Sequence, residues 1–503
     1  MAAGSAQITG PRTYGNWRKP TSSGLFGLGS LGTGIMLGGL ILSVLVTMAA
    51  GLFRGLITFG VLAVVLGTIL VRDRHGKSLL DRGLARLGWG SATRKGAHLY
   101  RSGPLGFALW GTHQLPGIAA QLRLSEHTDS YGRRFALIYA PTTRTYTAVF
   151  ATEPDGASLV DPDQVDVWVA DWGHWLANLA DEPGVEACAV TIETAPDTGH
   201  RLRREVASNV DPNAPAFARA MLSEVVDMYP SGSSVIKAYV TLTFSSVSAA
   251  TGKKRTDTEM GRDLAARLPG LTGSLAATGA GAARPLDAAE LCEVVRVAYN
   301  PGIATLVDEA HSAGEDTGLD WSDVGPVAAE AEWEGYRHDD AYSVTWSMTT
   351  APRGNVQSSV LARLLAPHRE VARKRVTLLY RPIDAAKAAA IVESDLRSAQ
   401  FVATSTTRPS ARAVLATRSA AATAQEEASG AGLVNFGMLV TATVLDVDRV
   451  AEAKAAIDNL AATARLRLRP VYGAQASAFA AALPLGLILP KHLKVPASMR
   501  DRL

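Results

Sequence analysis

Two short segments carry the residue types of a phosphate-binding loop. Gly76-Lys77-Ser78 supplies a lysine and a hydroxyl, and Gly252-Lys253-Lys254 supplies a glycine and a lysine. A phosphate loop also needs a glycine at its start, because backbone N–H groups must approach the phosphates there. Val71 and Val247 occupy these first positions, and no Ser or Thr follows Lys253. Neither segment is therefore predicted to bind a nucleotide.

A second group of residues has the side chains of a metal site. His338, Asp339 and Asp340 are consecutive, and Glu309 and His311 precede them. Their spacing matches no zinc or dimetal motif. A solvated acidic loop is the better interpretation, so no metal site is predicted.

Nucleophilic catalysis has no visible candidate either. The ten histidines include no His-x-x-x-His pair, and no Gly-x-Ser-x-Gly elbow is present. Cys188 and Cys292 lie within apolar segments, where a buried, unreactive thiol is the usual case. Two cysteines also exclude a disulfide framework and fit a reducing compartment. We therefore expect no catalytic residues, no cofactor and no enzymatic activity.

A long apolar region near the start of the chain dominates the remaining sequence. Residues 24–71 contain one charged residue, Arg54, which separates the runs Gly24–Phe53 and Gly55–Val71. A membrane-spanning helix needs about 20 apolar residues. The pattern predicts a two-helix transmembrane hairpin with Arg54 in its turn. Ala49-Ala50-Gly51 resembles a signal-peptidase site, but a signal peptide would have a shorter apolar core and no second run.

The charges around the hairpin predict its orientation. Basic residues stand on both sides of it: Arg12, Arg18, Lys19, Arg72, Arg74 and Lys77. Such residues stay on the cytoplasmic side of the membrane. We therefore expect a multi-pass protein of the cell (plasma) membrane with both termini cytoplasmic. Segment 1–23 would be a cytoplasmic N-terminal segment.

The segment after the hairpin, 72–105, is basic and amphipathic. Its leucines (Leu79, Leu80, Leu84 and Leu87) follow a helical pattern, which is typical of a helix at a membrane surface. Arg82, Arg86, Arg94 and Lys95 would meet anionic headgroups, so the lipid bilayer is an expected partner. The net charge of the chain is only +3, so no direct sequence-specific nucleic-acid binding is expected.

The rest of the chain alternates strands and helices in two similar series. The expected strands of the first series are 134–140, 145–151, 185–194 and 235–244, and its expected helices centre on 168–179, 214–229, 257–268 and 287–298. In the helix at 214–229 we expect Phe217, Met221, Val225 and Met228 to face inward. Strands at 343–348, 376–380 and 434–445, with helices after Asp384 and after Val450, form the second series. The fold class is α/β (α+β), with tandem ferredoxin-like modules at 106–305 and 341–503 joined by an acidic linker at 306–340.

The C-terminal portion resembles a known family. From Val376 to Pro490 the order strand, long Ala/Glu helix, strand, helix, strand is followed by VYGAQASAFAAALPLG. This is similar to the N-terminal non-motor domain of type IV secretion (conjugation) ATPases. The positions that match the element ending that domain are Gln475, Phe479, Leu483, Pro484, Leu485 and Gly486. Segment 11–103 resembles the PrgI-type two-helix membrane subunits of the same machines, so the chain looks like an actinobacterial fusion of the two.

The resemblance implies a scaffold function. The chain ends where the ATPase domain of that family would begin, which implies a separate secretion-motor ATPase as partner, with other membrane subunits and a homo-oligomer around it. Leu485, Leu487, Ile488 and Leu489 are the expected motor-docking residues; alternatively, they close the core of their own domain. An EccE-like component of a type VII secretion machine and a membrane-tethered enzyme remain alternative functions.

Overall fold

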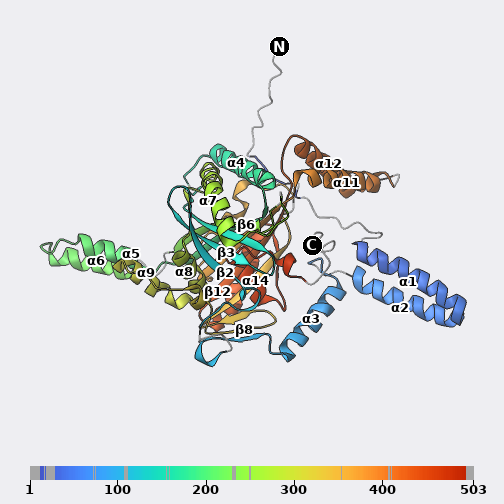
Figure 1. The fold of residues 1–503 in the computed structure, drawn as a ribbon, viewed down its shortest axis with the longest axis horizontal. Coiled ribbons are helices and arrows are strands. Elements are labelled where there is room, and N and C mark those ends of the chain that lie inside the picture. The colour runs from blue at the N-terminus through green and yellow to red at the C-terminus, as the bar shows by residue number, and fades with distance from the viewer. Residues whose placement is uncertain are drawn as a thin grey trace, which may run out of the picture. The chain divides into compact units, whose positions relative to one another are not determined.

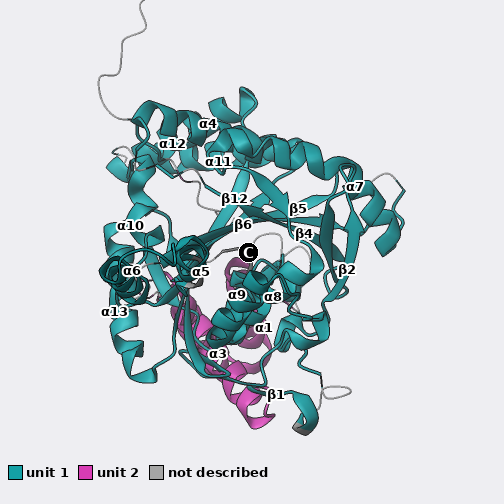
Figure 2. Cartoon of the chain, turned by 90° about the vertical axis from the view of Figure 1, so that its left-hand side faces the viewer, with its two compact units in different colours: residues 1–16, 98–492 teal, residues 17–97, 493–503 magenta. Residues whose placement is uncertain are grey.

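The computed structural model describes residues 12–15, 17, 29–71, 73, 75–106, 112–154, 156–157, 159–228, 234–248, 251–352, 354–405, 408 and 410–493. Figure 2 shows two compact units, which we name the helical unit (17–97 and 493–503) and the sheet unit (1–16 and 98–492). Of the basic residues expected beside the hairpin, Arg18, Lys19, Arg72 and Arg74 lie outside the described residues.

The helical unit contains the two apolar helices that the sequence predicts. These are α1 (Gly29–Ala50) and α2 (Leu52–Leu70), and the stretches 32–50 and 52–70 are long and apolar enough to cross a membrane. The turn between them is at Gly51, whose φ of 89° suits glycine. Arg54 was expected in this turn but lies in the first turn of α2. A third helix, α3 (Leu79–Arg94), follows.

In the described residues, one antiparallel sheet of 13 strands lies at the centre of the sheet unit. Figure 1 shows the sheet with helices around it. Its order is β1-β8-β9-β10-β12-β11-β5-β6-β4-β3-β2, with β7 paired to β4 and β13 paired to β10. The strands are β1 (Leu99–Arg101), β2 (Arg123–Thr128), β3 (Arg134–Ala140), β4 (Thr145–Thr152), β5 (Val185–Pro196), β6 (Ser234–Ser245), β7 (Ala283–Pro285), β8 (Ala328–Ala331), β9 (Tyr336–His338), β10 (Ala341–Thr350), β11 (Arg373–Pro382), β12 (Val434–Val444) and β13 (Arg467–Pro470).

The strand order repeats along the sheet. In the first half β7, β4, β6 and β5 lie side by side, and in the second half β13, β10, β12 and β11 lie side by side. In each half the order across the sheet is the fourth, first, third and second of these strands along the chain. The halves meet where β5 pairs with β11, with Val190 opposite Leu378. Strand alternation gives the sheet two faces. We call them the apolar face, which carries Val190, and the threonine face, which carries Thr191 and Thr377.

Helices cover both faces. On the apolar face, α4 (Pro162–Asp181) and α7 (Asp257–Gly273) enclose the core of the first half, while α10 (Ala362–Leu365) and α13 (Val450–Thr463) enclose that of the second. The other helices are α5 (His200–Asn209), α6 (Ala216–Met228), α8 (Ala288–Tyr299), α9 (Ala304–Ala313), α11 (Ala385–Thr404), α12 (Ala411–Ala428) and α14 (Gln475–Ala482). The hairpins α5–α6 and α11–α12 are inserted at matching places, β5 to β6 and β11 to β12.

The structure confirms the mixed α/β class and most expected elements, with two differences. Residues 306–340, expected to be a linker, hold most of α9 together with β8 and β9, and the latter two belong to the sheet. Helix α6 was expected to turn its apolar residues inward, but Phe217, Met221, Val225 and Met228 are exposed. An amphipathic pattern shows that a helix has an apolar face, not which surface covers that face.

Candidate functional site: the C-terminal element and the exposed helix α6

The residues that resemble the secretion-ATPase element lie on the threonine face. Gln475 begins α14 and is fully buried. Its amide oxygen accepts a hydrogen bond from the Thr345 N–H at 2.8 Å, and its amide nitrogen donates to the Thr345 carbonyl at 3.1 Å. The side chain therefore satisfies both backbone groups of one residue of β10. Removing the Gln475 amide would leave the buried N–H and carbonyl of Thr345 without these hydrogen bonds, which would lower the stability of the fold.

Phe479 fills the centre of the same face. Its ring lies 4.7 Å from the ring of His338 and 5.1 Å from that of Tyr299, centroid to centroid, and the Arg375 guanidinium is 5.7 Å from its centroid. The side chain is fully buried. Aromatic pairs at such distances contribute beyond their buried area. Phe479 therefore holds α14 on the sheet.

The segment after α14 continues along the threonine face. The Thr377 hydroxyl donates to the Ala482 carbonyl at 2.7 Å, and the Thr243 hydroxyl donates to the Gly486 carbonyl at 3.4 Å. Leu483 and Pro484 are buried. Gly486 has a φ of 66°, and a Cβ there would lie 2.1 Å from the Thr147 hydroxyl oxygen. Only glycine fits this position without strain.

Most apolar side chains of the predicted motor-docking segment are buried. Leu485, Leu487 and Ile488 are 1 %, 6 % and 6 % exposed, and Leu489 is partly buried. Apolar side chains that pack against their own sheet are not free to anchor a partner. The burial of Leu485, Leu487 and Ile488 therefore favours the alternative interpretation, closure of the chain's own core, whereas Leu489 is only partly covered. Docking of a motor by this segment stays a prediction.

A buried ion-pair cluster marks the junction of the two halves. Glu193 on β5 faces Arg373 and Arg375 on β11, with the Arg375 Nε 2.9 Å from one Glu193 carboxylate oxygen. Burial alone would raise the pKa of Glu193, but the charges of Arg375 and Arg373 outweigh burial and lower the pKa to about 2. The carboxylate is fully charged and paired at neutral pH. The cluster thus ties the halves together and lacks the exposed, perturbed acid of a catalytic site.

His338 is a fully buried histidine of the sheet unit. Its Nδ1 lies 2.5 Å from the Tyr299 carbonyl and its Nε2 lies 2.7 Å from the Ser343 hydroxyl, which contacts the Thr443 hydroxyl at 2.7 Å. Burial lowers its pKa to about 4, so the ring is neutral at pH 7. A histidine beside a serine resembles a catalytic pair. Both side chains are 0 % exposed, however, so no substrate reaches them.

The structure does not bring the other candidate metal-ligating residues together into one site. Asp339 pairs with Arg296 at 3.1 Å, and His311 pairs with Glu293 at 2.9 Å. His338 is buried, so the expected solvated loop is wrong for this residue. Among the described residues no cluster of His, Cys, Asp and Glu is placed to hold a metal ion. Both free cysteines, Cys188 and Cys292, are buried as expected.

The described residues of the two phosphate-loop segments form ordinary connections between elements. Ser78 is the N-cap of α3 and forms a capping box with Asp81. Gly252 lies in a turn between β6 and α7, and the Lys254 ammonium lies 5.0 Å from the ring centroid of Tyr139. Both segments begin or connect ordinary elements.

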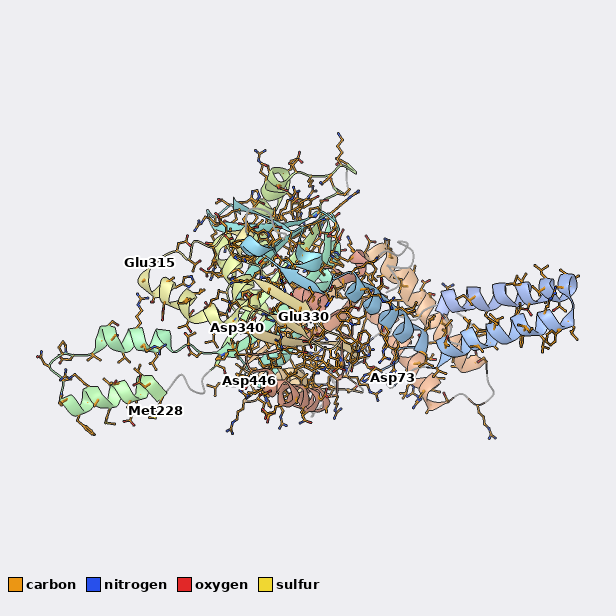
Figure 3. All side chains as sticks on the ribbon, turned by 90° about the horizontal axis from the view of Figure 1, so that it is seen from below. Asp73, Met228, Glu315, Glu330, Asp340 and Asp446 are labelled. Atoms are coloured by element: carbon orange, nitrogen blue, oxygen red, sulfur yellow. The ribbon has the colours of Figure 1, made fainter. Side chains whose placement is uncertain are left out.

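Helix α6 exposes several large apolar side chains on one element of the sheet unit. Figure 3 shows it extending away from the sheet, with Met228 labelled at its end. Phe217, Met221, Val225 and Met228 are 76 %, 51 %, 48 % and 60 % exposed. They recur at four-, four- and three-residue spacing and form one stripe, the α6 stripe. The sequence contains this spacing, but inward packing was the wrong interpretation of it.

One family model matches the hairpin region. A family described as a domain of unknown function (DUF8461) matches residues 21–81, which include α1, α2 and the start of α3. No curated protein matches the chain.

Proposed function

We propose that the chain is a membrane-anchored scaffold subunit of a type IV secretion-like (conjugation) machine, and that it positions a separately encoded motor ATPase at the membrane. The α6 stripe is the observation that carries this proposal. Contiguous apolar surface on a soluble body marks a protein-interaction site. The resemblance of the C-terminal element to the non-motor domain of the secretion ATPases supports a motor as the partner.

The membrane part of the proposal rests on α1 and α2. Both are apolar along their length, apart from Arg54, and only 6 % of the residues in each apolar stretch are buried. In water such a surface has a large free-energy cost, whereas in lipid it has none. Because Arg12 and Lys77 flank the helices, we place both termini in the cytoplasm and the turn at Gly51 outside. A reporter fused after Leu503 should be active only in the cytoplasm.

We further infer that the sheet unit is a tandem of ferredoxin-like modules. The orders β7-β4-β6-β5 and β13-β10-β12-β11, both antiparallel, correspond to the β-α-β-β-α-β order with helices on one face. Equivalent threonine pairs support this: Thr147 faces Thr243 at 3.2 Å, and Thr345 faces Thr441 at 3.0 Å. The Val190–Leu378 pair would lie on the pseudo-twofold axis.

The test is co-purification with the motor. In native membranes solubilised with mild detergent, the tagged chain should bring down an ATPase of the secretion machine. Replacing Phe217 and Met221 by Glu should abolish this association without unfolding the body, because both side chains are already exposed. Replacing Tyr131, an exposed residue of the β2–β3 turn, by Glu is the matched control. Retained association in the double variant would contradict docking at the α6 stripe.

A further inference from the structure

Helix α3 has an apolar face whose four leucines are all exposed. It contains 16 residues, none of them buried. Leu80, Leu84 and Leu87 recur at four- and three-residue spacing and are 36 %, 58 % and 73 % exposed, and Leu79 beside them is 46 % exposed. Four leucines on one side of a short helix form a distinct surface, which we call the α3 leucine face.

The helix is also intrinsically weak. It contains Gly83, Gly88 and Gly90, and each glycine in a helix costs about 1 kcal/mol relative to alanine. The capping box of Ser78 and Asp81 stabilises the helix by about 1 kcal/mol. Isolated helices of this length are marginal in water even without glycine. A surface that covers the α3 leucine face is therefore needed to keep the segment helical.

Charge identifies the kind of surface. Residues 75–95 contain five basic residues and one acidic residue, Asp81. Lys77 stands before α3, and Arg94 and Lys95 stand at its end. Arg82 pairs with Asp73, which is labelled in Figure 3, so the excess positive charge comes from the other four. Each basic residue near an anionic membrane contributes about 1 kcal/mol of attraction. A hydrophobic protein groove would not require this excess.

We propose that α3 lies in the headgroup layer of an anionic membrane, with the α3 leucine face at the acyl boundary and the basic residues at the lipid phosphates. The proposal rests on membrane insertion of α1 and α2, because α3 follows α2 after eight residues. Amphipathic helices with basic flanks bind membranes in this orientation. Helix α3 would thus orient the anchor and make it selective for anionic lipid.

The experiment uses the full chain with one reporter cysteine. Cys188 and Cys292 are buried, so a cysteine at Leu84 can be labelled selectively with a polarity-sensitive nitrobenzoxadiazole dye. The protein is reconstituted into vesicles of phosphatidylcholine alone or of phosphatidylcholine mixed with phosphatidylglycerol. The matched control carries the cysteine at Ala85, which points about 100° away around the helix.

The expected result is a blue-shifted, brighter dye at position 84 in the anionic vesicles and a smaller shift in phosphatidylcholine, with little change at position 85. Arg86→Glu together with Arg94→Glu should reduce the shift at position 84, as should high salt. Equal spectra at position 84 in both vesicles and in detergent would overturn the proposal. A blue shift in detergent that grows with protein concentration would overturn it in favour of a second copy.

Carbonate extraction of the same vesicles tests the insertion of α1 and α2 separately from the position of α3. Protein that is extracted by carbonate contradicts insertion of α1 and α2. Protein that stays in the vesicles while the dye at position 84 reports water contradicts only the assignment of α3.

Discussion

Removing the residues after Gly486 should destabilise the sheet unit, because Leu487 and Ile488 belong to its buried core. Leu487 and Ile488 are each 6 % exposed. Burying one such side chain stabilises a fold by roughly 1.5–3 kcal/mol, so losing both costs about 3–6 kcal/mol. Native proteins are stable by about 5–15 kcal/mol in total. A chain that ends at Gly486 should therefore unfold at a much lower urea concentration, or fail to accumulate.

The assay is urea unfolding followed by tryptophan fluorescence of the full chain in detergent. Because the truncated chain could fail to fold, Ile488→Ala provides a measurable second variant. Its expected loss is about 2–5 kcal/mol, the usual cost of truncating a buried Ile or Leu. Leu493→Ala is the control, since Leu493 is 46 % exposed and should change stability by less than about 0.5 kcal/mol. An unchanged urea midpoint for Ile488→Ala would refute the core assignment and revive docking by this segment.

Two further changes test the threonine face. Burial lowers the pKa of His338 to about 4, so between pH 6.5 and 4 the unfolded chain binds a proton that the folded chain does not. The free energy of unfolding should therefore decrease as the pH is lowered from 6.5 to 4. Protonation of Glu193 lowers the stability only below about pH 4.5. The urea midpoint of a His338→Gln variant should therefore change less between pH 6.5 and 4.5 than that of the original chain. Gly486→Ala should cost about 1–3 kcal/mol, since the new Cβ meets Thr147. Gly437→Ala, with no atom within 4 Å of the new Cβ, should be nearly neutral; equal effects of the two alanines in thermal unfolding would contradict the packing.

Local patterns predicted the elements of the fold well. Trp175 and Leu179 lie on the buried side of α4, as their helical spacing indicates, and Asp384 caps α11. The strand expected at 434–445 corresponds to β12. Its alternate residues Met438, Val440 and Ala442 lie together in the core, because side chains two residues apart in a strand share a face.

Long-range arrangement was beyond the sequence. Nothing local in β5 or β11 specifies that these two strands pair and join the halves into one sheet. The same limit explains the error about the surface of α6. The apolar residues of α6 and those near the C-terminal end of the sheet unit look alike in the sequence, and only the tertiary structure shows that Phe217 is exposed while Leu487 and Ile488 are buried.

The most direct test of the scaffold function is site-specific photocrosslinking in cells that carry the secretion machine. A photoreactive amino acid at Met221, in the α6 stripe, should form a crosslink to the motor ATPase. The same probe at Leu159, which is fully exposed and precedes α4, should not. A motor crosslink at position 221 alone is the predicted result. Absence of the motor at position 221, in cells where the chain is inserted and the machine is active, would contradict the account.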